Sequence, residues 1–136
     1  FYLSNLQIPK STITQKEGEK LFGEIGCVKC HTSSFTLADG YEIKPFTDVL
    51  LHDMGEDLSD GRDEFEATPR EWRTPALWGL GKYKLASGPE LLHDGRAKTI
   101  EEAILWHGGE ARKIKNDFMS LSLENRERII NYVKEL

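Results

Sequence analysis

The chain has 136 residues, a quarter of them Leu, Ile, Val or Phe, which suits one compact domain and excludes both two separate cores and a disordered chain. Its formal net charge of −5 argues against sequence-independent binding to nucleic acid or to an anionic membrane. The longest uninterrupted apolar run, Ala103 to Trp106, is far shorter than the roughly 20 residues that a membrane span needs.

The N-terminal residues show no export signal. Residue 1 is Phe rather than Met, and no basic segment followed by an apolar stretch precedes the polar region that begins at Gln15. We therefore expect a mature product or an excised domain, from which a targeting segment has been removed.

The first predicted helix begins at a capping box formed by Thr14 and Glu17. Its apolar side chains recur at helical spacing and form one buried stripe, made of Leu21, Phe22 and Ile25. The helix leads directly to Cys27. Residues 32–46 lack sustained periodicity and predict a loop with at most short strands, and Val49–Leu51 is predicted to be a short buried anchor.

The second half of the chain contains three predicted helix starts. Thr74-Pro75 has the form of an N-cap followed by proline, which predicts a short helical turn. Thr99 and Glu102 form another capping box, ahead of a helix that two glycines end, and the last amphipathic helix begins near Ser122. Because strand signals are nearly absent, we expect a mainly α fold with long ordered loops, forming a single domain over residues 1–136.

The two cysteines of the chain lie in one pentapeptide, C-V-K-C-H, which contains Cys27, Cys30 and His31. This spacing is the attachment signature of a c-type haem. The two thiols can reach the two vinyl groups of one porphyrin, and the adjacent imidazole can bind the iron as the proximal ligand. We therefore predict one covalently bound haem c.

Two other uses of these residues stay open. A zinc site would need a further ligand from a distant histidine, and the candidates are His52, His93 and His107. A redox-active dithiol would place its cysteines at the start of a helix that follows a strand, whereas here they follow a predicted helix. Either alternative would make the chain a non-haem module.

The sixth coordination position of the haem iron has five candidate ligands in this sequence: His52, Met54, His93, His107 and Met119. A histidine opposite His31 would give a low-spin electron carrier of lower potential, and a methionine would raise the potential. An open position would permit peroxide or oxygen chemistry. From the residues alone, His107 and Met54 are about equally good candidates.

Two further features bear on ligand binding. Arg73 lies in a tryptophan-rich segment, where its planar guanidinium can bind a haem propionate or pair with Glu71 at the surface. The acidic stretch of residues 56–66 fits the calcium-binding EF-hand pattern poorly, because Leu58 occupies a ligand position. Calcium is therefore only weakly supported as a second ligand.

Four motifs occur in one order along the chain: CVKCH, LLHDMGEDLSDG, EWRTPALWGLG and LLHDGRAKTIEEAILWHGGEA. Through them, residues 17–133 resemble the C-terminal haem domain of the bacterial di-haem oxidoreductases sometimes labelled thiol oxidoreductases, a branch of the di-haem cytochrome c peroxidase superfamily. The resemblance implies a cytochrome c-like fold. It also implies that Arg73 lies near a haem propionate, that Trp106 lies at the haem, and that His107 rather than Met54 is the distal ligand.

The resemblance also implies partners and a location. The family carries a second haem motif in an N-terminal domain, and this sequence has one motif only. In the peroxidases the C-terminal haem receives electrons, while the other haem meets peroxide. We therefore expect an electron-transfer domain that works with the second haem domain and a redox protein donor; a free-standing monohaem peroxidase is the alternative. Since bacteria attach haem covalently outside the cytoplasmic membrane, we expect a periplasmic protein.

Overall fold

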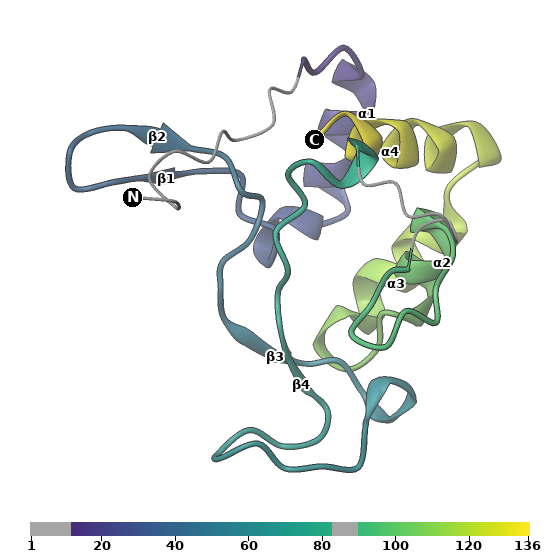
Figure 1. The fold of residues 1–136 in the computed structure, drawn as a ribbon. Helices are drawn as coiled ribbons and strands as arrows, with labels where there is room; N and C mark the ends of the chain where they lie inside the picture. The colour runs from purple at the N-terminus through teal and green to yellow at the C-terminus, as the bar shows by residue number, and fades with distance from the viewer. Residues whose placement is uncertain (1–11, 83–89) are drawn as a thin grey trace.

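The computed structural model describes residues 12–82 and 90–136 and has the mainly α fold that the sequence predicts (Figure 1). The α-helices of these residues are α1 (Lys16–Glu24), α2 (Ile100–Trp106), α3 (Arg112–Ser120) and α4 (Leu123–Glu135). The antiparallel strand pairs are β1 (Phe35–Thr36) with β2 (Glu42–Ile43), and β3 (Leu51–Asp53) with β4 (Glu71–Arg73). The short 3₁₀ turns are η2 (Cys27–Lys29), η3 (Glu56–Leu58), η4 (Leu80–Lys82) and η5 (Gly109–Ala111). None of the described helices has both the length and the apolar character needed to cross a membrane.

The hydrophobic core forms where α1 lies against α4 (Figure 1). Phe22 of α1 packs edge-on against Tyr132 of α4, with the ring centroids 5.4 Å apart. Ile129 is fully buried, and burying such a side chain stabilises the fold by about 2 kcal/mol. The two helices approach so closely at Gly18 that a Cβ there would lie 2.2 Å from the Arg128 carbonyl oxygen. A larger residue at position 18 would therefore force the helices apart.

The helix starts agree with the sequence prediction at α2 and α4 but not at α1. Thr99 accepts a hydrogen bond from the backbone N–H three residues further on, as its capping box predicts, and α4 begins directly after Ser122, as predicted, where the Ser122 hydroxyl also caps the helix. The capping box predicted at Thr14 is wrong. Glu135 at the end of α4 instead accepts hydrogen bonds from the N–H groups of Thr14 at 2.6 Å and Gln15 at 3.0 Å. A carboxylate is favoured at a helix N-terminus by its charge, so a distant residue replaces the local cap.

Two predictions for the middle of the chain are wrong. Residues 75–78 form no helix, because Thr74 extends the β3–β4 pairing by donating its N–H to the Leu50 carbonyl oxygen at 2.9 Å. The Thr74 carbonyl oxygen also accepts a hydrogen bond from the Thr47 hydroxyl at 2.6 Å. The residues Val49–Leu51 are each more than half exposed rather than buried, because β3 belongs to a two-stranded sheet outside the α1–α4 core.

Helix α3 has no counterpart in the sequence prediction.

A close backbone contact joins the end of β3 to the turn after α2. Gly109 has a φ of +47°, and a Cβ there would lie 2.1 Å from the Asp53 carbonyl oxygen. A Cβ on Gly108 would lie 2.6 Å from the Met54 carbonyl oxygen. Only glycine fits at either position. This contact therefore brings together two segments that carry candidate iron ligands.

Candidate functional site

The two cysteines lie in a tight turn directly after α1. The turn η2 begins at Cys27, and the His31 N–H closes the motif by donating to the Cys27 carbonyl oxygen at 3.0 Å. Both cysteines are free and half-buried. Burial raises the pKa of Cys27 to about 12, and burial together with the negative charge of Asp48 raises the pKa of Cys30. Both side chains are therefore protonated thiols at neutral pH.

His31 is held with one ring nitrogen occupied and the other available. Its Nδ1 lies 3.0 Å from the Phe46 carbonyl oxygen. Because a carbonyl oxygen can only accept a hydrogen bond, this contact puts the ring proton on Nδ1 and the lone pair on Nε2. Burial lowers the pKa of His31, against the opposing effect of this hydrogen bond, and so favours the neutral ring. Histidines that bind metals usually have this arrangement.

His107 repeats this arrangement at the end of α2. Its Nδ1 lies 2.7 Å from the Ala103 carbonyl oxygen, which again leaves the lone pair on Nε2. Burial lowers the pKa of His107 as well. The charge of a protonated His107 contributes to lowering the pKa of His31, so the two rings lie within electrostatic range of each other. The structure thus contains two histidines whose Nδ1 atoms contact backbone carbonyl oxygens and whose Nε2 atoms are both available.

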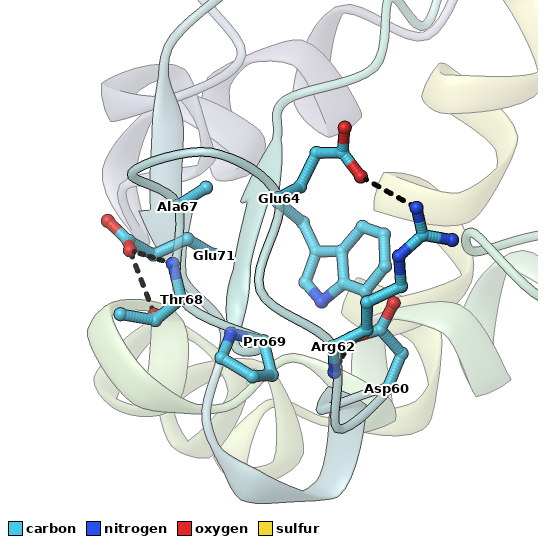
Figure 2. A pocket seen from close by; sticks show the side chains of 8 residues that line it. Asp60, Arg62, Glu64, Ala67, Thr68, Pro69 and Glu71 are labelled. Carbon is cyan, nitrogen blue, oxygen red and sulfur yellow. Dashed lines mark hydrogen bonds and ion pairs between the residues drawn. The ribbon is translucent and has the colours of Figure 1, made fainter.

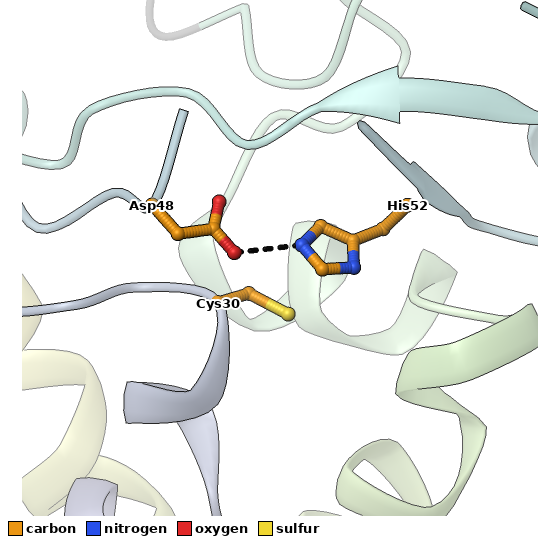
Figure 3. A group of neighbouring side chains, drawn as sticks. All are labelled: Cys30, Asp48 and His52. Atoms are coloured by element: carbon orange, nitrogen blue, oxygen red, sulfur yellow. Dashed lines mark hydrogen bonds and ion pairs between the residues drawn. The ribbon is translucent and has the colours of Figure 1, made fainter. Parts of the chain in front are cut away.

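His52 has no available ring nitrogen. Its Nε2 lies 2.7 Å from Asp48 Oδ2, and its Nδ1 lies 2.9 Å from Glu110 Oε2. Figure 3 shows Asp48 and Cys30 beside this ring. The hydrogen bond with Glu110, followed by that with Asp48, raises the pKa of His52 and favours its charged form. To bind iron, His52 would have to break one of these two contacts.

The other candidate iron ligands lie in different surroundings. The ring of His93 stacks on Trp72, with centroids 3.6 Å apart and an interplanar angle of 5°. Met119 lies on α3 and is 55% exposed. The backbone of Met54 lies against Gly108, the residue that follows His107. The two leading candidates thus lie on adjoining segments of the backbone, and the choice of His107 over Met54 stays a prediction.

Arg73 and Trp106 were predicted to contact the haem, and the structure shows their protein contacts. Arg73 is exposed on β4 and forms no ion pair with a described residue. The surface pair with Glu71 is absent from this part of the chain, because the Glu71 carboxylate accepts two hydrogen bonds from its neighbour Thr68. The indole of Trp106 is covered by the Arg96 guanidinium, whose central carbon lies 4.8 Å from the ring centroid. The haem contacts of both residues stay predictions.

The acidic stretch forms part of a long loop between β3 and β4, which also contains a pocket (Figure 2). The pocket is lined by Asp60, Arg62, Glu64, Ala67, Thr68, Pro69, Glu71 and Trp72, none of which is a candidate iron ligand. Leu58, at a predicted calcium-ligand position, is 2% exposed and points into the protein. Within the described residues, the acidic stretch gathers no group of three potential metal ligands, so no cluster supports calcium there.

Three charged residues near the site were not identified from the sequence. Asp48 and Glu110 bracket His52, and Arg96 donates from Nη1 to the Asp57 carbonyl oxygen at 2.6 Å while covering Trp106. The sequence did offer one signal that Glu110 lies near the site, because it follows the candidate ligand His107 by three residues in the HGGEA motif. Nothing in the local sequence indicates the role of Asp48, because β3 and the loop before it are not helical.

Comparisons with known proteins agree with the fold and identify a family. The family model described as "Di-haem oxidoreductase, putative peroxidase" matches residues 1–136. No curated protein matches the sequence at a significant level. Among solved structures, a hydrazine synthase chain from Kuenenia stuttgartiensis, studied under xenon pressure, is 22% identical with a TM-score of 0.62. The match covers 99% of this chain and 52% of that chain, so the present chain spans about half the length of its structural relative.

Proposed function

Because the chain belongs to the di-haem oxidoreductase family, we propose that it is an electron-transfer domain that holds one haem c. In this proposal Cys27 and Cys30 form the two thioether bonds, and His31 and His107 are the axial ligands. The haem, when bound, supplies an iron that accepts and releases one electron at a time. The family description names two haems, and the single C-x-x-C-H motif of this sequence accounts for one of them.

The observation that carries this proposal is the shared arrangement of His31 and His107. In both residues a backbone carbonyl oxygen holds Nδ1, at 3.0 Å and 2.7 Å respectively, and leaves Nε2 available. Such partners fix the tautomer and the orientation of a ligating ring. His52 lacks this arrangement, because carboxylates occupy both of its nitrogens. The fit of the residues to a haem with two histidine ligands therefore rests on hydrogen bonds within the protein.

Two histidine ligands favour an electron carrier over a peroxidase. With both axial positions occupied, peroxide has no place to bind the iron. His107 is also well anchored, because the glycines that follow it lie against the backbone of Asp53 and Met54. The alternative, a free-standing monohaem peroxidase, requires His107 to stay away from the iron.

Arg73 and Trp106 are proposed to contact the edge of the haem. A haem propionate is an anion that loses hydration when it is partly buried, and a guanidinium can replace that hydration with two hydrogen bonds. Arg73 is suited to this role because it forms no ion pair with a described residue. Trp106 directly precedes His107 and is half-buried, so it can cover the same side of the porphyrin.

The partners and the location follow from the same proposal. We place the second haem of the family in another domain of a larger protein and expect a redox protein to deliver electrons. The support is the family description, which names a di-haem protein. We place the protein in the periplasm, because covalent haem attachment in bacteria takes place outside the cytoplasmic membrane.

Covalent attachment is tested by producing the chain with a periplasmic haem-ligation system. A pyridine haemochrome spectrum after denaturation should show one haem per chain, and the haem should stay with the protein during extraction with acidified organic solvent. The matched control replaces Cys27 and Cys30 with serine, which should leave any bound haem extractable. Haem that leaves the unmodified chain during extraction would contradict the proposed thioether bonds.

The carrier role is tested with hydrogen peroxide. The ferrous haem-loaded chain should exchange electrons rapidly with a small redox protein or mediator and react slowly with peroxide in stopped-flow absorption measurements. The His107→Ala variant should react faster with peroxide, because it vacates an axial position. Sustained peroxide turnover by the unmodified chain would instead support the free-standing peroxidase.

A further inference from the structure

The residues shown in Figure 3 provide three different kinds of ligand atom for one small cation. A sulfur of Cys30, a carboxylate oxygen of Asp48 and a ring nitrogen of His52 all lie within 4.8 Å of one another. All three residues are half-buried. Cys30 comes from the turn after α1, and the other two come from residues 48–53, the β3 segment, which consists of β3 and the three residues before it. Thiolate, imidazole and carboxylate are the protein ligands that Zn²⁺ uses.

The two ligands from the β3 segment are already held in place by neighbouring groups. The Nδ1 of His52 lies 2.9 Å from Glu110, whose other oxygen accepts a hydrogen bond from the Asp53 N–H at 3.0 Å. A zinc-binding histidine commonly donates its second N–H to a carboxylate in this way. Asp48 accepts a hydrogen bond from the Leu50 N–H at 3.0 Å. The orientation of both ligands is therefore set before a cation arrives.

The charge and the spacing of the cluster also suit a divalent cation. Asp48 and Glu110 bring two negative charges to one imidazole, and the loss of the Cys30 proton would add a third. The Asp48 and His52 ligand atoms are 2.7 Å apart. At zinc–ligand distances of about 2.1 Å, two such atoms in a tetrahedral site lie about 3.4 Å apart. A small opening of this contact would admit the ion in place of the shared proton.

We propose that the chain, before haem attachment, binds one Zn²⁺ through Cys30, Asp48 and His52, and that thioether formation at Cys30 abolishes this site. When the ion binds, the Cys30 thiol releases its proton, the proton shared by His52 Nε2 and Asp48 is also released to solvent, and a water molecule completes the four ligands. After haem attachment the sulfur carries neither a proton nor a negative charge, so it no longer binds Zn²⁺ strongly. Only the claim that haem attachment prevents Zn²⁺ binding rests on the proposed function.

This ligand set differs from a zinc site built on both cysteines. Cys27 lies outside the group of atoms that meet within 4.8 Å, and its half-buried side chain packs against the hydrophobic core instead. It would have to leave this packing to join the ion. Zinc and haem attachment therefore compete for the sulfur of Cys30 alone, while Cys27 stays available for the porphyrin.

The test uses the full chain, produced without haem-ligation machinery and kept reduced. Zn²⁺ is titrated in competition with a chromophoric chelator, and Co²⁺ serves as a spectroscopic probe of the same site. We expect one ion per chain and a thiolate-to-cobalt charge-transfer band. His52→Ala and Asp48→Asn should each weaken Zn²⁺ binding by more than about tenfold, and Glu110→Gln by about tenfold, because it orients a ligand. Cys27→Ser is the matched control and should bind as the unmodified chain does.

Two outcomes in the haem-free chain would overturn the site. The absence of a thiolate band at one equivalent of Co²⁺ would do so without any variant, and therefore does not depend on how the variants fold. Binding that Cys27→Ser abolishes would assign the ion to the two cysteines instead.

The haem-loaded chain tests whether haem attachment abolishes Zn²⁺ binding. It should show no thiolate band and at least tenfold weaker Zn²⁺ binding, and an unchanged affinity would overturn this part. If haem never becomes attached, the proposed function fails, whereas the titration of the haem-free chain still gives its own result.

Discussion

The substitution Gly109→Ala tests the contact that joins β3 to the turn after α2. The alanine Cβ would lie 2.1 Å from the Asp53 carbonyl oxygen and 2.7 Å from the Gly55 nitrogen. Both are backbone atoms, which no side-chain rotation can move. The φ of +47° adds strain of about 1 kcal/mol, and overpacking of a tight contact costs about 1 to 3 kcal/mol. We therefore expect the free energy of unfolding to fall by about 2 to 4 kcal/mol.

Urea unfolding followed by circular dichroism measures this loss, with two glycines as controls. Gly61 has a φ of +71°, and a Cβ there would meet no atom within 4 Å, so Gly61→Ala should cost only the strain, about 1 kcal/mol. Gly23 lies inside α1 with the same open space, and Gly23→Ala should stabilise the chain by up to about 1 kcal/mol. A loss for Gly109→Ala no larger than that for Gly61→Ala would show that the backbone contact is not tight.

Three other predictions concern charge and the cofactor. Arg73→Lys keeps the charge but loses the planar fork, so it should shift the haem midpoint potential or loosen haem binding; no change in either property, also in Arg73→Ala, would remove the propionate contact. Because the pKa of His52 is raised by Glu110 and Asp48, its stabilisation should be fully present below pH 6.5 and be lost as the pH rises through the raised pKa. The difference in unfolding free energy between the unmodified chain and His52→Gln should therefore shrink with rising pH, and a difference independent of pH would contradict this. When both chains are produced with haem-ligation machinery, serine at Cys27 and Cys30 should lower the melting temperature in calorimetry, because the bound haem adds apolar contact surface to the fold. An unchanged melting temperature would contradict this.

Local signals in the sequence predicted the parts of the fold that depend on neighbouring residues. The cap at Thr99 involves the backbone three residues further on and forms as predicted, and α4 begins at the position that its amphipathic pattern predicted, directly after Ser122. The start of α1 could not be predicted in this way, because its partner Glu135 is 121 residues from Thr14. Thr74 resembles a cap, but the pairing of β3 with β4 uses its backbone instead.

In the candidate site, too, the features that depend on neighbouring residues could be predicted, and the contacts between distant residues could not. The adjacent residues of C-V-K-C-H could be proposed as a haem site from the sequence, and His107 could be proposed as a ligand from the resemblance. Glu110 lies 58 residues from the ring of His52 that it contacts, and no local pattern links the two. The Nδ1 contacts of His31 and His107 depend on where the chain places two backbone carbonyl groups, which the sequence does not reveal.

The axial ligands of the iron decide between an electron carrier and a catalyst, and electron paramagnetic resonance of the ferric haem-loaded chain identifies them. With His31 and His107 both bound, the spectrum should be low-spin and typical of two histidine ligands, and His107→Ala should convert it to a high-spin form. His93→Ala is the matched control and should leave the spectrum unchanged, because its ring stacks on Trp72. A high-spin spectrum of the unmodified chain, or a low-spin spectrum that survives His107→Ala, would contradict the proposed pair of ligands.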